Sequence, residues 1–163
     1  MQTIPVRIAG AAARGFAFGL VATTTMSAAM LGFQKVGLMG RMPPRKITEH
    51  FLAMVGLRRA TSRGTRRVLS TLTHFAFGGV CAALFEAGRE IASIRRGEPA
   101  RPRTRAPLPL GLAFGTAVWA VSYLGWVPSL GIMAPPSRDR FGRPTSMVLA
   151  HWVYGATLAA ASR

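Results

Sequence analysis

Two histidines occupy matched positions in otherwise apolar segments, and they are the side chains of this chain best suited to chemistry. His74 lies in "THFAFGGVCAAL" (73–84), and His151 lies in "AHWVYGATLAAA" (150–161). In both segments the histidine is followed by an aromatic residue, an aliphatic one, a second aromatic residue and a glycine. An imidazole in such a place can form a structural hydrogen bond, take up a proton near pH ~6.5, or ligate haem.

Three interpretations of this pair stay open from sequence alone. As structural groups, the imidazoles would hydrogen-bond across helices, a contribution of about 0.6–2 kcal/mol each in a membrane. As a proton-responsive pair they would change helix packing when charged, and Glu86, on the same segment as His74, would extend the polar site. Haem ligation by His74 and His151 from opposite helices of a bundle is the weaker alternative. The expectation is therefore no cofactor and no metal.

Acidic residues are too few for a catalytic set. The chain has five, and no nucleophile–base–acid set or metal-ligand cluster can be assembled by spacing. Glu49 and Asp139 follow the two Pro-Pro pairs at different distances and do not form a matched carboxylate pair. Cys81 is the only cysteine, which excludes an intrachain disulfide. We expect no enzyme activity.

The elements that position these residues are indicated by the distribution of charge. Half of the 163 residues are hydrophobic, yet the net charge is +16. The charged residues avoid four runs, at 15–34, 68–85, 106–137 and 145–162. Because about 20 apolar helical residues cross a bilayer core, the sequence predicts an all-α protein with transmembrane helices at 12–34, 68–87, 109–128 and 145–162.

The basic residues fall almost entirely between these runs. Such loops are typical of membrane proteins and meet anionic headgroups, so the expected partner is a lipid bilayer and not nucleic acid. The Pro-Pro loops carry 12 basic residues and the opposite side carries 9. The positive-inside rule then places the Pro-Pro loops in the cytoplasm.

The chain also contains an internal repeat. "GFAFG" (15–19) corresponds to "GLAFG" (111–115), and "GLMGRMPP" (37–44) to "GIMAPP" (131–136), in the same order as the histidine segments. We infer two helical-hairpin repeats, 1–88 and 109–163, joined by a basic Pro/Arg-rich linker, 89–108. Each unit crosses the membrane twice, so the repeats are parallel.

Glycines spaced four residues apart predict close helix packing in a four-helix bundle, since small residues let helices approach in lipid. The predicted packing positions are Gly15, Gly19, Gly78, Gly111, Gly115 and Gly155.

The first Pro-Pro loop is longer than the second. After Pro44, suited to the first turn of a helix, Ile47, Phe51, Met54 and Val55 recur on one helical face. We expect a short amphipathic helix at 44–57, lying in the membrane interface.

The text "MPPRKITEHF", followed by a helix with His-aromatic-x-aromatic-Gly, resembles the YagU-like bacterial inner-membrane proteins. The resemblance is strongest at Pro43, Pro44, Ile47, Thr48 and Glu49 and around His74 and Gly78. It implies a small multi-pass protein of the bacterial cytoplasmic membrane with a link to acid stress and no agreed activity. The expected role is a structural or accessory subunit of a membrane assembly, self-associated or bound to other subunits. The alternative is a proton-responsive protein or a small permeation component that uses the histidine pair.

Overall fold

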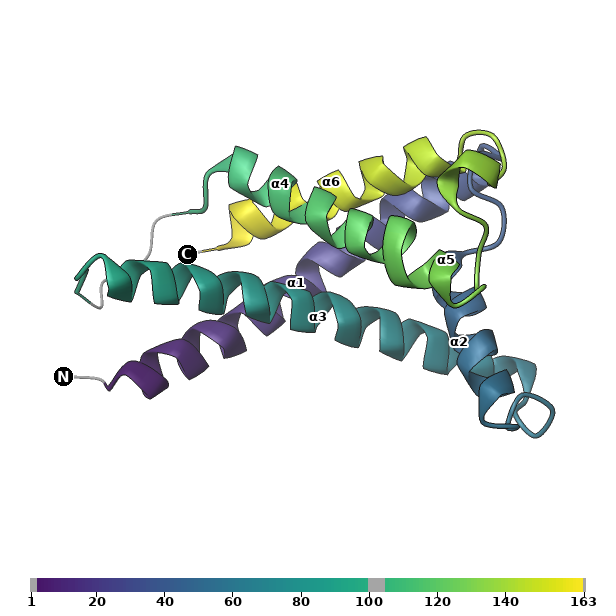
Figure 1. Cartoon of the computed structure of the whole chain (residues 1–163), viewed down its shortest axis with the longest axis horizontal. Helices are drawn as coiled ribbons and strands as arrows, with labels where there is room; N and C mark the ends of the chain where they lie inside the picture. Colours follow the sequence, from purple (N-terminus) through teal and green to yellow (C-terminus); the bar gives the residue numbers. More distant parts are fainter. Residues whose placement is uncertain (1–2, 100–104, 163) are drawn as a thin grey trace.

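The computed structural model describes residues 3–99 and 105–162, which form an all-α bundle (Figure 1). In chain order the elements are α1 (Ile4–Lys35), α2 (Pro43–Met54), α3 (Arg63–Arg95), α4 (Leu108–Trp119), the π-helical segment η1 (Ala120–Trp126), α5 (Val127–Ser129), the 3₁₀ turn η2 (Pro136–Arg138) and α6 (Arg143–Ala161). The predicted all-α class is confirmed, because every regular element among residues 3–99 and 105–162 is a helix.

Three helical stretches are long and apolar enough to cross a membrane: Ile4–Lys35, Arg63–Arg95 and Leu108–Ser129. Large apolar side chains such as Val21, Leu84 and Val121 are more than half exposed on them, as expected of surfaces that face lipid. The chain is thus a multi-pass membrane protein. The fourth expected span, 145–162, is helical as part of α6, but α6 is not among these three.

The helices run back and forth between two ends of the bundle (Figure 1). α1 and α4 run toward the end that carries α2 and α5, and α3 and α6 return from it. α1 packs extensively on α3, α4 packs on α6, and α1 also contacts α6. The two hairpins therefore meet mainly through α1 and α6.

The predicted glycines lie where the helices of each hairpin approach most closely. On α1, Gly15 and Gly19 face the backbone of α3 at Ala82 and Gly78, and a Cβ at either glycine would clash. All of α1's buried residues recur every three or four positions, so they form one stripe: Ala11, Gly15, Gly19, Ala22, Thr23, Met26 and Met30. That stripe is the helical face predicted from spacing.

The second hairpin is also closed at glycines. Gly111 and Gly115 of α4 face the carbonyls of Gly155 and His151 on α6. A Cβ at Gly155 would meet the backbone of Gly111. Each hairpin is thus closed by backbone-to-backbone contact at glycine.

Two helices extend beyond the charge-free runs. α1 begins at Ile4 instead of residue 12, and α3 spans 63–95 instead of 68–87, so the first residues of the expected linker are helical. Arg7 and Glu90 explain the extension, because they form an ion pair at 2.7 Å between the two helices. Residues 100–104 of the linker lie outside the described residues.

The third expected span, 109–128, is not a regular α-helix. α4 gives way to η1, where Gly125 has φ −98° and ψ −109°. Pro128 follows three residues later; it has no N–H and its ring crowds the preceding turn. Ser129 Oγ donates to the Gly125 carbonyl at 2.8 Å and satisfies one group of the broken ladder.

Candidate functional site

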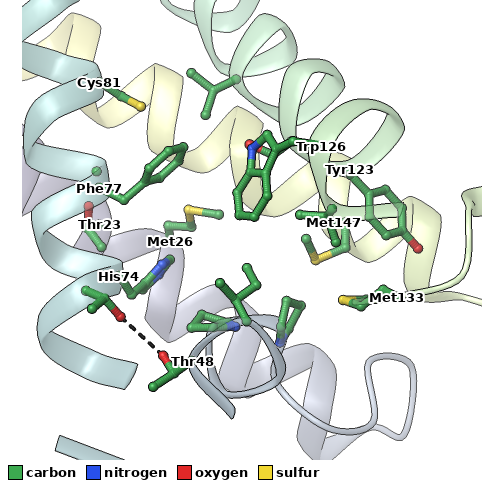
Figure 2. Close-up of a pocket in the computed structure, with 18 of the residues that line it drawn as sticks. Thr23, Met26, Thr48, His74, Phe77, Cys81, Tyr123, Trp126, Met133 and Met147 are labelled. Atoms are coloured by element: carbon green, nitrogen blue, oxygen red, sulfur yellow. Dashed lines mark hydrogen bonds between the residues drawn. The ribbon is translucent and has the colours of Figure 1, made fainter. Parts of the chain in front are cut away.

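A cavity of about 570 Å³ lies between the two hairpins (Figure 2). α3 does not pack closely along α4; the two meet at aromatic pairs, Phe77–Trp126 with ring centroids 6.5 Å apart and Phe85–Phe114 at 4.8 Å. The space bounded by α1, α2, α3, η1 and α6 is lined by Met, Phe, Leu, Ile and Val side chains. Its volume falls within the range of small-molecule sites, roughly 300–1,000 Å³.

Both histidines line this cavity, so the structure brings the predicted pair together. His151 is 6% exposed, and its Nδ1 lies 2.7 Å from the Met147 carbonyl one turn earlier in α6. The Nε2 atom of His74 is buried and has no hydrogen-bond partner among the described residues. Figure 2 shows the His74 ring pointing into the space between the helices. The two matched histidines therefore differ: His151 Nδ1 contacts a carbonyl, whereas His74 Nε2 is buried without a partner among the described residues.

A second polar atom without a partner lines the same cavity from the other hairpin. Ser122 Oγ in η1 is buried and makes no hydrogen bond within the described part of the chain. Buried polar groups in native proteins are nearly always hydrogen-bonded, and each exception needs an explanation. The described residues hold four such atoms: His74 Nε2 and Ser122 Oγ belong to residues that line this cavity, and Arg66 Nε and Trp119 Nε1 belong to residues that do not.

The kinked segment η1 supplies one wall. Ser122, Tyr123 and Trp126 of η1 and Val127 of α5 all line the cavity. The non-helical backbone at Gly125 separates the helical turns on either side of it. Trp126 enters the cavity in Figure 2, across from Phe77 of α3.

α2 covers the end of the cavity near the Pro-Pro loops. Pro43 lies in its first turn, and Pro43, Pro44, Ile47, Thr48 and Phe51 all line the cavity. Thr48 Oγ1 lies 3.3 Å from Thr73 Oγ1 of α3, which fixes α2 against that helix. The helix predicted at 44–57 thus exists, over 43–54, and Val55 caps its end instead of continuing it. Its place in the membrane interface stays a prediction. Five of the six predicted motif residues contribute to this wall.

The sixth motif residue, Glu49, lies outside the cavity lining. Its carboxylate accepts from Arg45 Nε at 2.9 Å and lies 3.7 Å from Arg41. The hydrogen bond from Arg45, with the charges of Arg45 and Arg41, keeps the pKa of Glu49 below its ordinary value.

Glu86, grouped with the histidines from sequence, is placed elsewhere. It is 1% exposed, pairs with Arg89 at 2.9 Å and accepts from Ser162 Oγ at 2.6 Å. It follows His74 by twelve residues, roughly 18 Å along a helix, and does not line the cavity. Glu86 instead joins the C-terminal end of α6 to α3.

A buried polar network that sequence reasoning missed holds the second Pro-Pro loop. Tyr123 donates to Asp139 at 2.6 Å, and Asp139 pairs with Arg143 at 2.8 Å. Arg143 Nε also donates to the Met39 carbonyl of the first loop at 2.8 Å. The network joins the two hairpins at the end where both Pro-Pro segments lie.

Burial alone would raise the pKa of Asp139, but hydrogen bonds from Tyr123, the Arg140 N–H and Arg143, with the Arg143 charge, hold it below its ordinary value. The ion pair therefore stays charged at neutral pH.

The missed residues are Ser122, Tyr123, Trp126, Asp139 and Arg143. One feature of the sequence could have indicated them. Gly125 and Pro128 lie within an apolar run and predict a break in the helix, which changes the direction of the side chains around it. Among residues 3–99 and 105–162, no group of three or more His, Cys, Asp and Glu side chains could hold a metal ion.

Comparison with known proteins gave no relative: no protein-family model, curated protein or solved structure matches this chain. The cavity and its polar atoms are therefore the basis for a functional conclusion.

Proposed function

We propose that this chain is a non-enzymatic accessory protein of the bacterial cytoplasmic membrane that holds an apolar molecule between two hairpin units. In this proposal the bundle has four spans, with α6 as the fourth, arranged as two parallel repeats. The bacterial location rests on the resemblance to YagU-like proteins, and the Pro-Pro loops face the cytoplasm by the charge bias of the loops.

The two turns after α1 and α5 support the repeat. Gly37 and Gly131 both have positive φ, 80° and 67°. In each turn the glycine N–H bonds the carbonyl three residues back and the next N–H bonds the carbonyl five back, which is the Schellman pattern. A buried methionine follows each turn, Met39 and Met133. Gly56 and Gly97 end α2 and α3 with the same turn, so the turn is not particular to the two units. The feature particular to "GLM" and "GIM" is the buried methionine two residues after the glycine.

Contacts between the hairpins support α6 as a fourth span. Tyr154 donates to the Gly78 carbonyl at 2.6 Å, and Thr25 and Thr157 share a hydrogen bond of 2.9 Å. These contacts align α6 with α3 and α1 along the apolar part of the bundle. A helix in that place crosses the same layer as its neighbours.

The observation that carries the ligand proposal is the cavity itself. The pocket is partly open to the surroundings and is lined by residues of both units, most of them apolar. Pockets of this size and composition are the usual sites of small apolar molecules.

Trp126 provides the test. In a variant that keeps only this tryptophan (Trp119→Phe, Trp152→Phe), bromododecane in detergent micelles should quench Trp126 fluorescence saturably. Filling the cavity with Cys81→Phe should weaken the quenching, whereas Leu84→Phe, on the exposed face of the same helix, should not. Quenching that rises linearly with probe concentration and ignores Cys81→Phe would contradict ligand binding.

A proton-responsive role is the second candidate, favoured by one observation: both imidazoles line a single apolar cavity. A charged imidazole there would be costly and would shift helix packing. The double variant His74→Ala/His151→Ala should then lose any pH dependence of stability between pH ~5 and ~7. An unchanged profile removes this candidate and leaves the ligand proposal standing.

A further inference from the structure

We propose that the molecule held in the cavity is an uncharged lipid with a hydroxyl or carbonyl oxygen, which hydrogen-bonds to His74 and is oriented by Ser122. This inference rests on the proposed function and adds the chemical class of the ligand and the residues that select it. The apolar body of the lipid occupies the space between the hairpins, and its oxygen lies near His74 and Ser122.

The two unpartnered atoms define the polar part of the ligand. His74 Nε2 and Ser122 Oγ are buried, come from different hairpins and line one cavity. A buried polar atom without a partner costs about 1–3 kcal/mol, so each of the two lowers the stability of the empty bundle. A hydroxyl can donate and accept, and a carbonyl can accept from either group. Such an oxygen removes the cost that the empty cavity carries.

Several neighbouring polar side chains already have hydrogen-bond partners. His151 Nδ1 contacts Met147 O, Tyr154 donates to Gly78 O, and Thr23 donates to Gly19 O. Tyr123 donates to Asp139, and its hydroxyl points away from the cavity in Figure 2. Among the described lining residues, the fully buried side-chain atoms without a partner are His74 Nε2 and Ser122 Oγ.

The charge of the lining excludes an ionic ligand. No Asp, Glu, Lys or Arg is among the described residues that line the cavity. A carboxylate or an ammonium placed there would be buried without a counter-ion, at a cost of several kcal/mol. Fatty-acid anions and lipophilic amines are thus disfavoured relative to a neutral alcohol or carbonyl compound.

The apolar lining fits a flexible or irregular chain. Met26, Met30, Met133 and Met147 line the cavity, and Met side chains adapt to irregular shapes. The aromatic rings of Phe77 and Trp126 stand at 60° to one another and do not form a parallel slot. The cavity therefore favours an alkyl or isoprenoid body.

The test compares three probes in the variant with Trp126 as its only tryptophan: bromododecane, terminally brominated dodecanol and brominated dodecanoate at alkaline pH. The alcohol should quench at the lowest micellar concentration and the carboxylate at the highest. His74→Phe should weaken alcohol binding about tenfold, equivalent to about 1.4 kcal/mol, and leave bromododecane binding unchanged.

His50→Phe is the matched control, because His50 lies on α2 outside the cavity lining, and it should change neither probe. Ser122→Ala should weaken alcohol binding less than His74→Phe does. If His74→Phe does not fold, the same binding measurements are made on His74→Gln. Its amide keeps a hydrogen-bond donor, so this variant should still bind the alcohol more tightly than bromododecane.

The outcomes separate this inference from the proposed function. Saturable quenching by all probes with equal affinity, unaffected by His74→Phe, would overturn the inference and keep the apolar-ligand function. The cavity would then hold ordinary acyl chains. Absence of saturable quenching by any probe would overturn both.

Discussion

The two hairpins share a plan but differ at their Pro-Pro ends. After the same glycine turn, the first hairpin continues into the 12-residue helix α2, whereas the second forms only the single turn η2. The first loop places its acid, Glu49, in surface ion pairs with Arg45 and Arg41. The second buries Asp139 between Tyr123 and Arg143. One unit thus supplies a cover for the cavity, and the other supplies the polar contacts that hold the units together.

The two histidines also differ. His151 Nδ1 contacts a carbonyl of its own helix, whereas His74 Nε2 is buried without a partner among the described residues. Glycine packing differs by one helical turn: Gly19 faces Gly78 O and Ala82, whereas Gly111, which matches Gly15 in the sequence, faces Gly155 O and Ala159. Similar sequence segments can therefore form the same kind of hairpin and still differ in their contacts.

The largest expected effect separates the two acids. Asp139→Ala leaves the Arg143 charge buried without its partner, so the free energy of unfolding should fall by about 3–5 kcal/mol. Glu49→Ala, in exposed ion pairs, should lower it by less than about 1 kcal/mol. Denaturant titration in mixed micelles measures both. Equal losses would show that the two loops hold the bundle in the same way.

Glycine-to-alanine changes compare the two helix contacts. A methyl at Gly155 meets the backbone of Gly111, which cannot move aside, and should destabilise by about 1–3 kcal/mol. At Gly78 the obstacle is the Thr23 side chain, which can rotate, so the loss should be smaller. Gly88, with no neighbour within 4 Å, is the control and should gain stability from alanine's helix propensity. Thermal unfolding of the three variants tests this order, and a larger loss at Gly88 would contradict it.

Replacing each histidine by phenylalanine should give unequal results in the empty protein. His151→Phe removes the contact with Met147 and should cost about 1 kcal/mol. His74→Phe removes a polar atom that has no partner, so stability should stay level or rise. Chemical unfolding without added ligand measures the pair. A matching loss at both positions would mean that His74 has a partner in the membrane-embedded protein.

The smallest expected effect is a pH dependence in acid. The folded-state pKa of Asp139 lies below its ordinary value, so its charge stabilises the folded protein above the unfolded pKa of about 3.9. That contribution is lost as the pH falls from there through the folded pKa. Asp139→Asn should show a shallower loss of stability below pH ~4 than the unaltered protein. Parallel curves would assign the acid response to other carboxylates.

The helices could be predicted from the sequence because charge exclusion and glycine spacing are local patterns that act along one element. The prediction of α2 succeeded for the same reason: Pro44 and the apolar face of Ile47 and Phe51 lie within one helix. The outer ends of α1 and α3 were not predicted, since the Arg7–Glu90 pair that joins them is a contact between residues 83 positions apart.

The cavity could not be predicted from the sequence, because it exists where α3 and η1 do not pack closely against each other. Nothing local marks Ser122 or Trp126 as its lining; the break at Gly125 and Pro128 had to be seen first. Glu86 was wrongly grouped with His74 for a related reason. The two residues lie on the same helix, which suggested one site. The partners of Glu86, Arg89 and Ser162, lie near the opposite end of the bundle.

Cys81, the chain's single cysteine, lines the cavity. Thiols in apolar surroundings react slowly with alkylating reagents, because the thiolate is the reactive form and is disfavoured there. A lipid-soluble maleimide that enters the cavity can reach this thiol, so a bound molecule should slow its modification. Occupancy can therefore be followed in whole membranes without engineering the chain.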